Sequence, residues 1–248
     1  MKGVIIQARL GSTRFPKKIL RKLGNESIIE HVVTRTLRSK LSNKVIVITP
    51  SDGTLSKIKE NLGSFDIEYF EGSEQDVLSR YYYAAKNFNI DHICRITSDC
   101  PLIDPQLIDN CWEKYDMEGQ NCYVSNTCPP GEATYPDGQD IEIFPFSYLE
   151  KAHFEIQDPT RREHVTFQFW QDNTYTSKQY KSDIDYSDIR LTVDYLDDLK
   201  NLEILSEKIG KKEIKTLSYE EICSYILNNK LEEFLKPELR NKGWKNEN

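Results

Sequence analysis

Residues 3–8 read GVIIQA and run directly into RLGSTRFPKK at residues 9–18. The first six residues are a short apolar run, which is typical of a buried strand. The next ten form a polar loop that contains glycine. Apolar side chains then recur with helical spacing over residues 27–39. A buried strand, a loop and a helix in this order predict that the chain begins with a β-α unit.

The same alternation continues through the first half of the chain. Apolar runs that predict buried strands lie at 45–49, 67–70 and 92–97, and helical patterns lie at 52–62, 76–88 and 105–115. Strands that alternate with helices form a parallel sheet covered on both faces. Because crossovers between parallel strands are right-handed, we expect an α/β fold with a doubly wound, mostly parallel sheet.

The second half is less regular, although we expect one domain over residues 1–248. Residues 125–188 are expected to form an inserted arm packed on the main sheet. Within it, the alternation at 139–144 predicts a half-solvated strand, and 146–156 a helix. Beyond it, we expect a strand at 189–193 that returns to the core, helices at 197–208 and 218–227, and a flexible tail at 237–248.

Composition limits the classes of partner. The 248 residues include 33 Lys and Arg against 40 Asp and Glu, which gives a net charge of −7. This balance argues against a bulk electrostatic grip on nucleic acid, so no nucleic-acid partner is expected. No apolar stretch approaches the roughly 18–20 residues of a membrane helix, so no membrane partner is expected either.

The six cysteines and the N-terminus indicate the compartment. The cysteines form no C-x-x-C pair and have no histidine cluster beside them, which argues against a zinc site. The N-terminal apolar run is too short for a signal peptide. We therefore expect reduced thiols in a cytoplasmic protein.

The loop at 9–18 carries four cations and no acid. Gly11, Ser12 and Thr13 leave backbone N–H groups accessible, and such a loop can hold phosphate. Arg14 and Lys18 are four residues apart, so both could converge on one polyphosphate. The alternative is a solvated basic loop that ends a strand. The loop matches neither the P-loop pattern nor the dinucleotide-binding fingerprint.

Two aspartates follow predicted strands. Asp99 comes just after the strand at 92–97, and Asp194 just after the run at 189–193. Carboxylates suit Mg²⁺, which binds a few of them together with substrate phosphates. The alternative for each is a turn or helix cap, which is the role expected for Asp104. With the basic loop, the two acids form a coherent set for metal-assisted transfer at a nucleoside triphosphate.

Six sequence blocks carry a family resemblance. They read IIQARLGSTRFPKK (5–18), GSEQDVLSRY (72–81), RITSDCPLID (95–104), YPDGQDIE (135–142), REHVT (162–166) and RLTVD (190–194). Together and in this order they resemble the sugar cytidylyltransferases, which include the CMP-3-deoxy-manno-octulosonate and CMP-sialate synthetases. The likeness is closest to the spore-coat-polysaccharide type. It implies a Rossmann-like nucleotidyltransferase fold of the nucleotide-diphospho-sugar transferase type.

The resemblance also implies roles for individual residues. Lys18 and Arg14 would hold the triphosphate and act in catalysis with Asp99, while Asp99 and Asp194 would bind Mg²⁺. The residues expected at the nucleotide are Ala8, Arg9, Gly11, Ser12, Thr13, Arg14, Lys18, Ser73, Asp76 and Ser98. CTP would be the nucleotide. A homodimer is implied as well, with the arm at 125–188 as its interface.

The sequence departs from the family pattern at two places. Many relatives have glycine where this chain has Lys17, whose side chain could crowd the phosphates or add a charge. Residues 98–101 read Ser-Asp-Cys-Pro, whereas the octulosonate enzymes have Gly-Asp-Glu-Pro. This second difference argues against that particular sugar.

The arm is expected to select the acceptor. Its candidate acceptor-binding residues are Tyr135, Gln139, Asp140, Glu142, Arg162 and His164. The first four could meet sugar hydroxyls. Arg162, with Arg161, could bind a carboxylate or could belong to an exposed charged turn. His164 could orient the acceptor or act as a base, or it could be structural.

The resulting hypothesis is a CTP-dependent cytidylyltransferase that activates an acidic sugar for surface glycan synthesis. A nonulosonic acid of the sialic or legionaminic kind is the expected acceptor. Two alternatives stay open. The enzyme could use a sugar phosphate or another phosphorylated alcohol as acceptor, or the chain could be a non-catalytic nucleotide-binding module.

Overall fold

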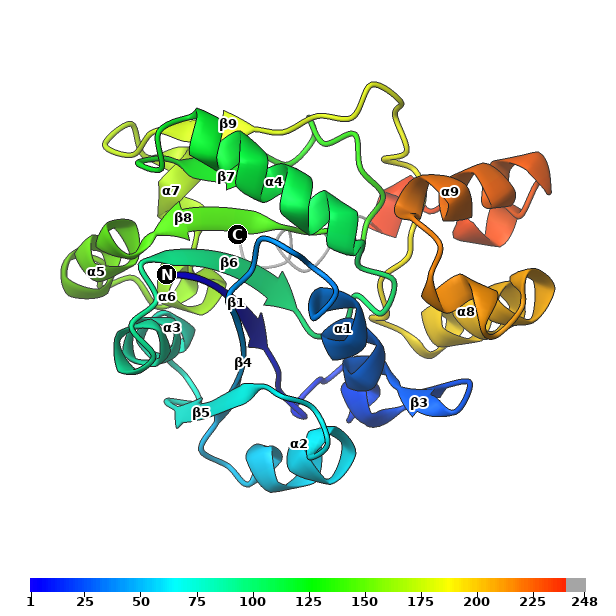
Figure 1. Cartoon of the computed structure of the whole chain (residues 1–248), viewed down its shortest axis with the longest axis horizontal. Helices are drawn as coiled ribbons and strands as arrows, with labels where there is room; N and C mark the ends of the chain where they lie inside the picture. Colours follow the sequence, from blue (N-terminus) through cyan, green and yellow to red (C-terminus); the bar gives the residue numbers. More distant parts are fainter. Residues whose placement is uncertain (240–248) are drawn as a thin grey trace.

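Strand β1 (Lys2–Gln7) lies inside a seven-stranded sheet in this computed structural model, which describes residues 1–239. The strand order is β5-β4-β1-β6-β8-β7-β9, which Figure 1 shows running from β5 near the bottom to β9 near the top. The apolar side chains of β1 are fully buried because helices cover both of its faces.

The strands of this sheet are β1, β4 (Lys44–Pro50), β5 (Glu68–Gly72), β6 (His92–Thr97), β7 (Tyr123–Ser125), β8 (Glu142–Pro145) and β9 (Ser177–Gln179). Strands β5, β4, β1 and β6 are parallel. Strand β8 runs antiparallel to both β6 and β7, and β9 is parallel to β7. Strands β2 (Lys22–Leu23) and β3 (Glu26–Ser27) form a separate antiparallel pair.

The helices divide between the two faces of the sheet. The first core cluster contains side chains of α1 (Ile28–Thr36), α2 (Thr54–Leu62), α4 (Pro105–Met117), α8 (Leu196–Ile209) and α9 (Tyr219–Asn228). The second contains side chains of α3 (Val77–Asn87), α5 (Phe146–Glu155) and α7 (Phe167–Gln171). Helix α6 (Pro159–His164) and 3-10 turns at Lys18–Leu20, Glu213–Lys215, Glu232–Phe234 and Pro237–Leu239 complete the elements. The predicted doubly wound, mostly parallel α/β fold is confirmed.

Side chains that accept hydrogen bonds start several of these helices. Ser27 and Glu30 form a reciprocal capping box at α1. Asp104 accepts the N–H of Gln106 at 2.8 Å, and Pro105 occupies the first turn of α4. The expectation that Asp104 caps this helix is therefore confirmed.

Two strand predictions were wrong. Residues 189–193 form no strand, because their N–H groups donate to separate loops: Arg190 to Phe234, Leu191 to Asp137 and Val193 to Asp99. The half-solvated strand expected at 139–144 is instead β8, which is buried throughout. Strand β8 lies between β6 and β7, and the two core clusters cover both of its faces.

Part of the segment 125–188, which the sequence predicts as an arm, lies in the main sheet as β8 and β9. Most of the tail predicted at 237–248 falls on residues 240–248, which lie outside the described residues. Within residues 1–239, no helix is both long enough and apolar enough to cross a membrane. All six cysteines are free and buried.

A buried arginine ties the C-terminal part of the chain to the sheet domain. Arg35 of α1 is 2% exposed and donates to four backbone carbonyls. These belong to Ile103 (2.6 Å), Ile214 (3.2 Å), Lys215 (2.9 Å) and Leu217 (2.7 Å). Burial lowers the pKa of Arg35 to about 10, so the guanidinium stays charged at neutral pH.

Arg35→Lys is expected to lower the free energy of unfolding by about 2–4 kcal/mol. An ammonium cannot reproduce the planar fork, and each buried carbonyl left without a donor costs about 1–3 kcal/mol. Urea unfolding followed by circular dichroism measures the change. Arg38→Lys is the matched control, because Arg38 is exposed and donates to one carbonyl of the same segment, that of Lys215. Equal stabilities for the two variants would contradict this role of Arg35.

Candidate active site

A cleft of about 610 Å³ opens at the carboxyl ends of β1 and β6. In parallel sheets, ligands bind at this edge. The cleft takes its walls from the loop after β1, the end of β6, the end of α6 and the stretch before α8. Its lining residues are Gln7, Arg9, Gly11, Ser12, Thr13, Arg14, Lys18, Ile19, Arg95, Thr97, Ser98, Asp99, Glu163, His164 and Asp194.

Lys18 lies between the two predicted metal-binding aspartates. Its Nζ donates to Asp99 Oδ2 at 2.7 Å and to Asp194 Oδ1 at 2.8 Å. The side chains of Lys18, Asp99 and Asp194 are 12%, 23% and 20% exposed. The Asp99 carbonyl also accepts the N–H of Val193 at 2.9 Å and the hydroxyl of Thr192 at 3.2 Å. These bonds hold the two acid-bearing segments side by side.

Lys18, Asp99 and Asp194 form a charged cluster, in which opposite charges stabilise one another. Burial opposes ionisation of Asp99, but the Lys18 ammonium outweighs it and lowers the pKa of the carboxyl to about 2. Burial also opposes the charge of Lys18, yet Asp99 and Asp194 raise its pKa above the usual value. The lysine is therefore a cation and Asp99 an anion throughout the physiological range.

Arg14 extends the cluster toward the mouth of the cleft. Its Nη2 donates to Asp194 Oδ1 at 3.1 Å, and its guanidinium lies over the Tyr195 ring at 5.4 Å from the centroid. Burial lowers the pKa of Arg14, but Asp194 has the opposite effect and the net shift is upward. The two cations predicted for the triphosphate thus meet at the same carboxylate oxygen.

Several residues of the basic loop line the cleft. Gly11, Ser12 and Thr13 are among them, and the Ser12 hydroxyl accepts the N–H of Phe15 at 3.3 Å, which shapes the turn. Lys17 has a left-handed backbone with φ of 56°, the region in which glycine is most at ease. Its side chain is exposed and lies outside the residues that line the cleft.

Several residues predicted at the nucleotide have other partners. Ala8 is fully buried, and its N–H donates to the Ile48 carbonyl at 2.9 Å. The Ser73 hydroxyl accepts the N–H of Asp76 at 3.1 Å. Asp76 caps α3 and accepts Arg162 Nη2 at 2.6 Å, which joins α3 to α6. Ser98 lines the cleft, as does Arg9, whose Nη1 lies 3.3 Å from Glu163 Oε1.

A smaller cavity of about 180 Å³ adjoins the cleft. The two share Arg14, Arg95, Thr97, Asp99 and Asp194 as lining residues. The other residues that line the smaller cavity are Cys100, Thr127, Cys128, Asp137, Asp140, Glu142, Arg190, Thr192 and Leu239. This cavity therefore lies beside both aspartates.

The predicted acceptor residues divide into two groups. Asp140 and Glu142 line the smaller cavity, and His164 lines the main cleft with its ring stacked on Phe167. Gln139 is fully buried, donates to the Leu102 carbonyl and accepts the N–H of Asp104. Tyr135 and Arg162 also line neither cavity. Tyr135 packs against Tyr180 and Tyr219. Arg162 donates to Asp76 and to two backbone carbonyls.

Sequence reasoning missed the ion pairs of two largely buried arginines, Arg95 and Arg190. Arg95 pairs with Glu142, which also accepts the hydroxyls of Tyr123 and Thr166 at 2.5 Å each. Arg190 pairs with Asp137, Asp194 and Asp198. The available signal was a charged residue inside an otherwise apolar run, which must find a partner when it is buried.

The donors of the cluster fit Mg²⁺. Asp99 and Asp194 both direct an oxygen at the same point, now contacted by the Lys18 ammonium. Within residues 1–239, no group of three or more His, Cys, Asp or Glu side chains forms a metal cage. A pair of carboxylates that leaves the other positions to substrate phosphates is how proteins commonly hold Mg²⁺.

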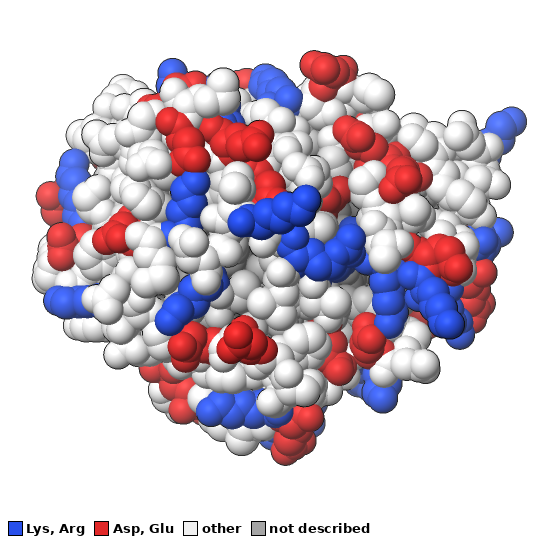
Figure 2. All heavy atoms as spheres, viewed as in Figure 1, with Lys and Arg blue, Asp and Glu red and all other residues white. Residues whose placement is uncertain are grey.

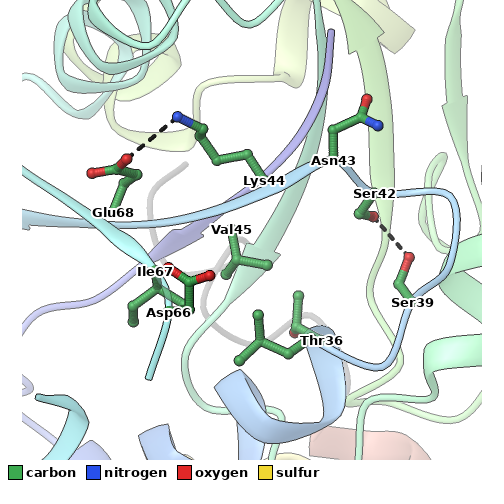
Figure 3. Close-up of a pocket in the computed structure, with 10 residues that line it drawn as sticks. Thr36, Ser39, Ser42, Asn43, Lys44, Val45, Asp66, Ile67 and Glu68 are labelled. Carbon is green, nitrogen blue, oxygen red and sulfur yellow. Dashed lines mark hydrogen bonds and ion pairs between the residues drawn. The ribbon is translucent and has the colours of Figure 1, made fainter. Parts of the chain in front are cut away.

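A third cavity, of about 230 Å³, lies where β4 and β5 begin (Figure 3). Two pairs of its polar groups contact one another: Lys44 Nζ lies 3.3 Å from Glu68 Oε1, and the hydroxyls of Ser39 and Ser42 are 2.8 Å apart. This cavity is at the amino ends of the strands, whereas Lys18, Asp99 and Asp194 lie at the carboxyl ends. On the face shown in Figure 2, basic and acidic side chains are interspersed.

Comparisons with known proteins agree with this chemistry. The sequence model of the family described as cytidylyltransferase matches residues 3–222. An uncharacterized protein of Methanocaldococcus jannaschii is 37% identical over 199 residues, 79% of each chain. The spore coat polysaccharide biosynthesis protein SpsF of Bacillus subtilis is 28% identical over 226 residues, 84% of this chain and 87% of SpsF.

A solved structure is similar throughout. The cytidylyltransferase from Leptospira borgpetersenii is 32% identical and superposes with a TM-score of 0.86, covering 94% of this chain and 96% of its own. Sequence identity at this level, together with a family match over most of the chain, indicates a common family as well as a common fold. The chain therefore belongs to the cytidylyltransferase family of nucleotidyltransferases.

Proposed function

We propose that this cytidylyltransferase transfers the cytidylyl group of CTP to the anomeric hydroxyl of an acidic sugar, a nonulosonic acid of the sialic or legionaminic kind. The observation that carries the proposal is the contact of Lys18 with both Asp99 and Asp194, where the nucleotide cleft meets the smaller cavity. The product would be a CMP-sugar for surface glycan synthesis.

In this reaction the anomeric hydroxyl loses its proton to solvent and its oxygen bonds to the α-phosphorus, while the bond from that phosphorus to the bridging oxygen breaks and pyrophosphate leaves. Lys18 and Arg14 stabilise the departing pyrophosphate, and the N–H groups of the basic loop orient the phosphates. Mg²⁺, when bound, would neutralise phosphate charge, and Asp99 and Asp194 are the residues that would hold it. Catalysis is by positioning and electrostatics, with no covalent enzyme intermediate.

Support for an acidic acceptor comes from the cations at the junction of the two cavities. Arg14 and Arg95, which pair with Asp194 and Glu142, line both, and a guanidinium suits a carboxylate. We also propose a cytoplasmic homodimer. The free, buried thiols are typical of a reducing compartment. Phe154 and Ile184, in the segment proposed as the interface, are 64% and 57% exposed.

Mixing the protein with CTP, Mg²⁺ and an acidic sugar is expected to release pyrophosphate, and EDTA is expected to abolish the release. Acceptors are compared in parallel: N-acetylneuraminate, legionaminate and 3-deoxy-manno-octulosonate against a panel of sugar 1-phosphates. UTP replaces CTP in a further series. A coupled pyrophosphate assay gives the rate of each combination.

The outcomes separate the hypotheses. Pyrophosphate release with sugar 1-phosphates and none with the acidic sugars would show that the acceptor is a sugar phosphate. CTP binding by calorimetry without release from any acceptor would point to a non-catalytic module. Equal rates with UTP would contradict selection of the base.

A further inference from the structure

Arg190 is a buried cation held by three acids. Its side chain is 4% exposed. Nη1 donates to Asp137, Nη2 donates to Asp194 Oδ2 and Asp198 Oδ2 at 3.0 Å each, and Nε donates to Asp198 Oδ1 at 3.0 Å. Such a group is costly to bury, and a buried ion network is weak evidence for stability. Its location next to the cleft calls for another explanation.

The two carboxylate oxygens of Asp194 have different partners. Oδ2 accepts from Arg190, whereas Oδ1 accepts from Lys18 at 2.8 Å and from Arg14 at 3.1 Å in the cleft. The backbone is fixed as well, because Asp198 Oδ2 accepts the N–H of Asp194 at 2.8 Å and that of Tyr195 at 2.9 Å. One oxygen is thus bound by the buried Arg190, while the other contacts two cations that line the cleft.

The same guanidinium joins the acceptor side to this acid. Asp137 lines the smaller cavity, and its backbone exchanges hydrogen bonds with Ile189 (2.9 Å) and Leu191 (2.7 Å). Gly138 has φ of 101°, and a Cβ there would lie 2.6 Å from the backbone nitrogen of Thr192. This close approach of two backbones, which only glycine permits, keeps Asp137 within reach of Arg190.

We propose that Arg190 is a positioning residue, which orients Asp194 so that Oδ1 faces the metal that accompanies the nucleotide. The inference rests on the proposed function, since it requires a metal–CTP complex in the cleft. Groups that hydrogen-bond to a metal ligand fix its orientation, and their loss commonly costs 10–100-fold in metal affinity. Lysine at this position keeps the charge but cannot contact Asp194 and both oxygens of Asp198 in one plane.

The test measures metal binding rather than turnover. Mn²⁺ is titrated into the protein with saturating CTP and no acceptor, and free Mn²⁺ is followed by electron paramagnetic resonance. Arg190→Lys is expected to raise the Mn²⁺ dissociation constant about tenfold. Arg35→Lys is the matched control, because it also alters a buried arginine but lies outside the residues that line either cavity. It is expected to lower the melting temperature and leave Mn²⁺ affinity unchanged.

A lower melting temperature for Arg190→Lys with wild-type Mn²⁺ affinity would overturn the positioning role. If that variant does not fold, Asp198→Asn decides: it keeps the side-chain shape, weakens the hold on Arg190, and is expected to weaken Mn²⁺ binding in the same direction. Wild-type Mn²⁺ affinity in Asp198→Asn would then overturn the proposal. Failure of the wild-type protein to bind CTP at all would instead refute the proposed function, and this inference with it.

Discussion

Lys18→Ala is expected to reduce turnover by about 100- to 1,000-fold, the usual cost of removing one preorganised charge donor from a transfer site. Lys18 is the contact that joins Asp99 to Asp194, and its side chain is 12% exposed in the cleft. Without it, Asp99 loses its lysine partner and Asp194 keeps only Arg14 and Arg190, so the two carboxylates repel the incoming triphosphate more strongly. The KM for CTP is therefore expected to rise while kcat falls.

Pyrophosphate release under saturating acceptor gives both constants. Lys17→Ala is the matched control, because Lys17 is adjacent in sequence but exposed and outside the cleft lining. Its rate is expected to stay within about twofold of wild type. Near-normal turnover in Lys18→Ala would remove the central cation from the mechanism.

Asp99→Asn is expected to lower turnover by about 100-fold or more. The amide keeps the shape of the side chain but carries no charge, so it is a poor ligand for Mg²⁺. The low pKa of Asp99, about 2, shows that the surroundings favour its anionic form. In contrast to Lys18→Ala, this variant is expected to need more Mg²⁺ for half-maximal rate, while metal-free CTP binding is retained.

The measurement is the Mg²⁺ dependence of pyrophosphate release, with CTP binding in EDTA as the companion assay. Asp197→Asn is the matched control, because Asp197 is 75% exposed and pairs with Lys200 outside the cleft. An unchanged Mg²⁺ requirement in Asp99→Asn would assign this carboxylate a structural role.

The fold was predictable because its signal is local. Apolar runs such as 45–49 and 92–97 became β4 and β6, and the helical patterns between them became α2 and α3. The errors arose where partners are distant in sequence. The run at 189–193 has the composition of a strand, but its N–H groups bond to three separate segments. Hydrogen-bond partners of that kind are a tertiary property.

The central residues of the candidate site were predictable from the sequence, but not all of the residues around them. Lys18, Asp99 and Asp194 were named from strand-end position and family resemblance, and the structure has them in contact. The chemistry of Gln139 and Arg162 predicts substrate contacts, yet both side chains are bound by protein groups. Sequence spacing reports which polar groups exist, whereas their partners depend on which segments pack together.

The contact between Lys18 and Asp194 spans 176 residues of sequence, and β1 pairs with β6 across 90 residues, as in Lys2 and His92. Contacts this distant slow folding, because a long loop must close before they form. Strand β1 is synthesised first, so its pairing with β6 cannot form until β6 has been synthesised. A nascent chain that ends before residue 194 lacks one of the two acids, so the contact of Lys18 with both aspartates forms only after residue 194 has been synthesised.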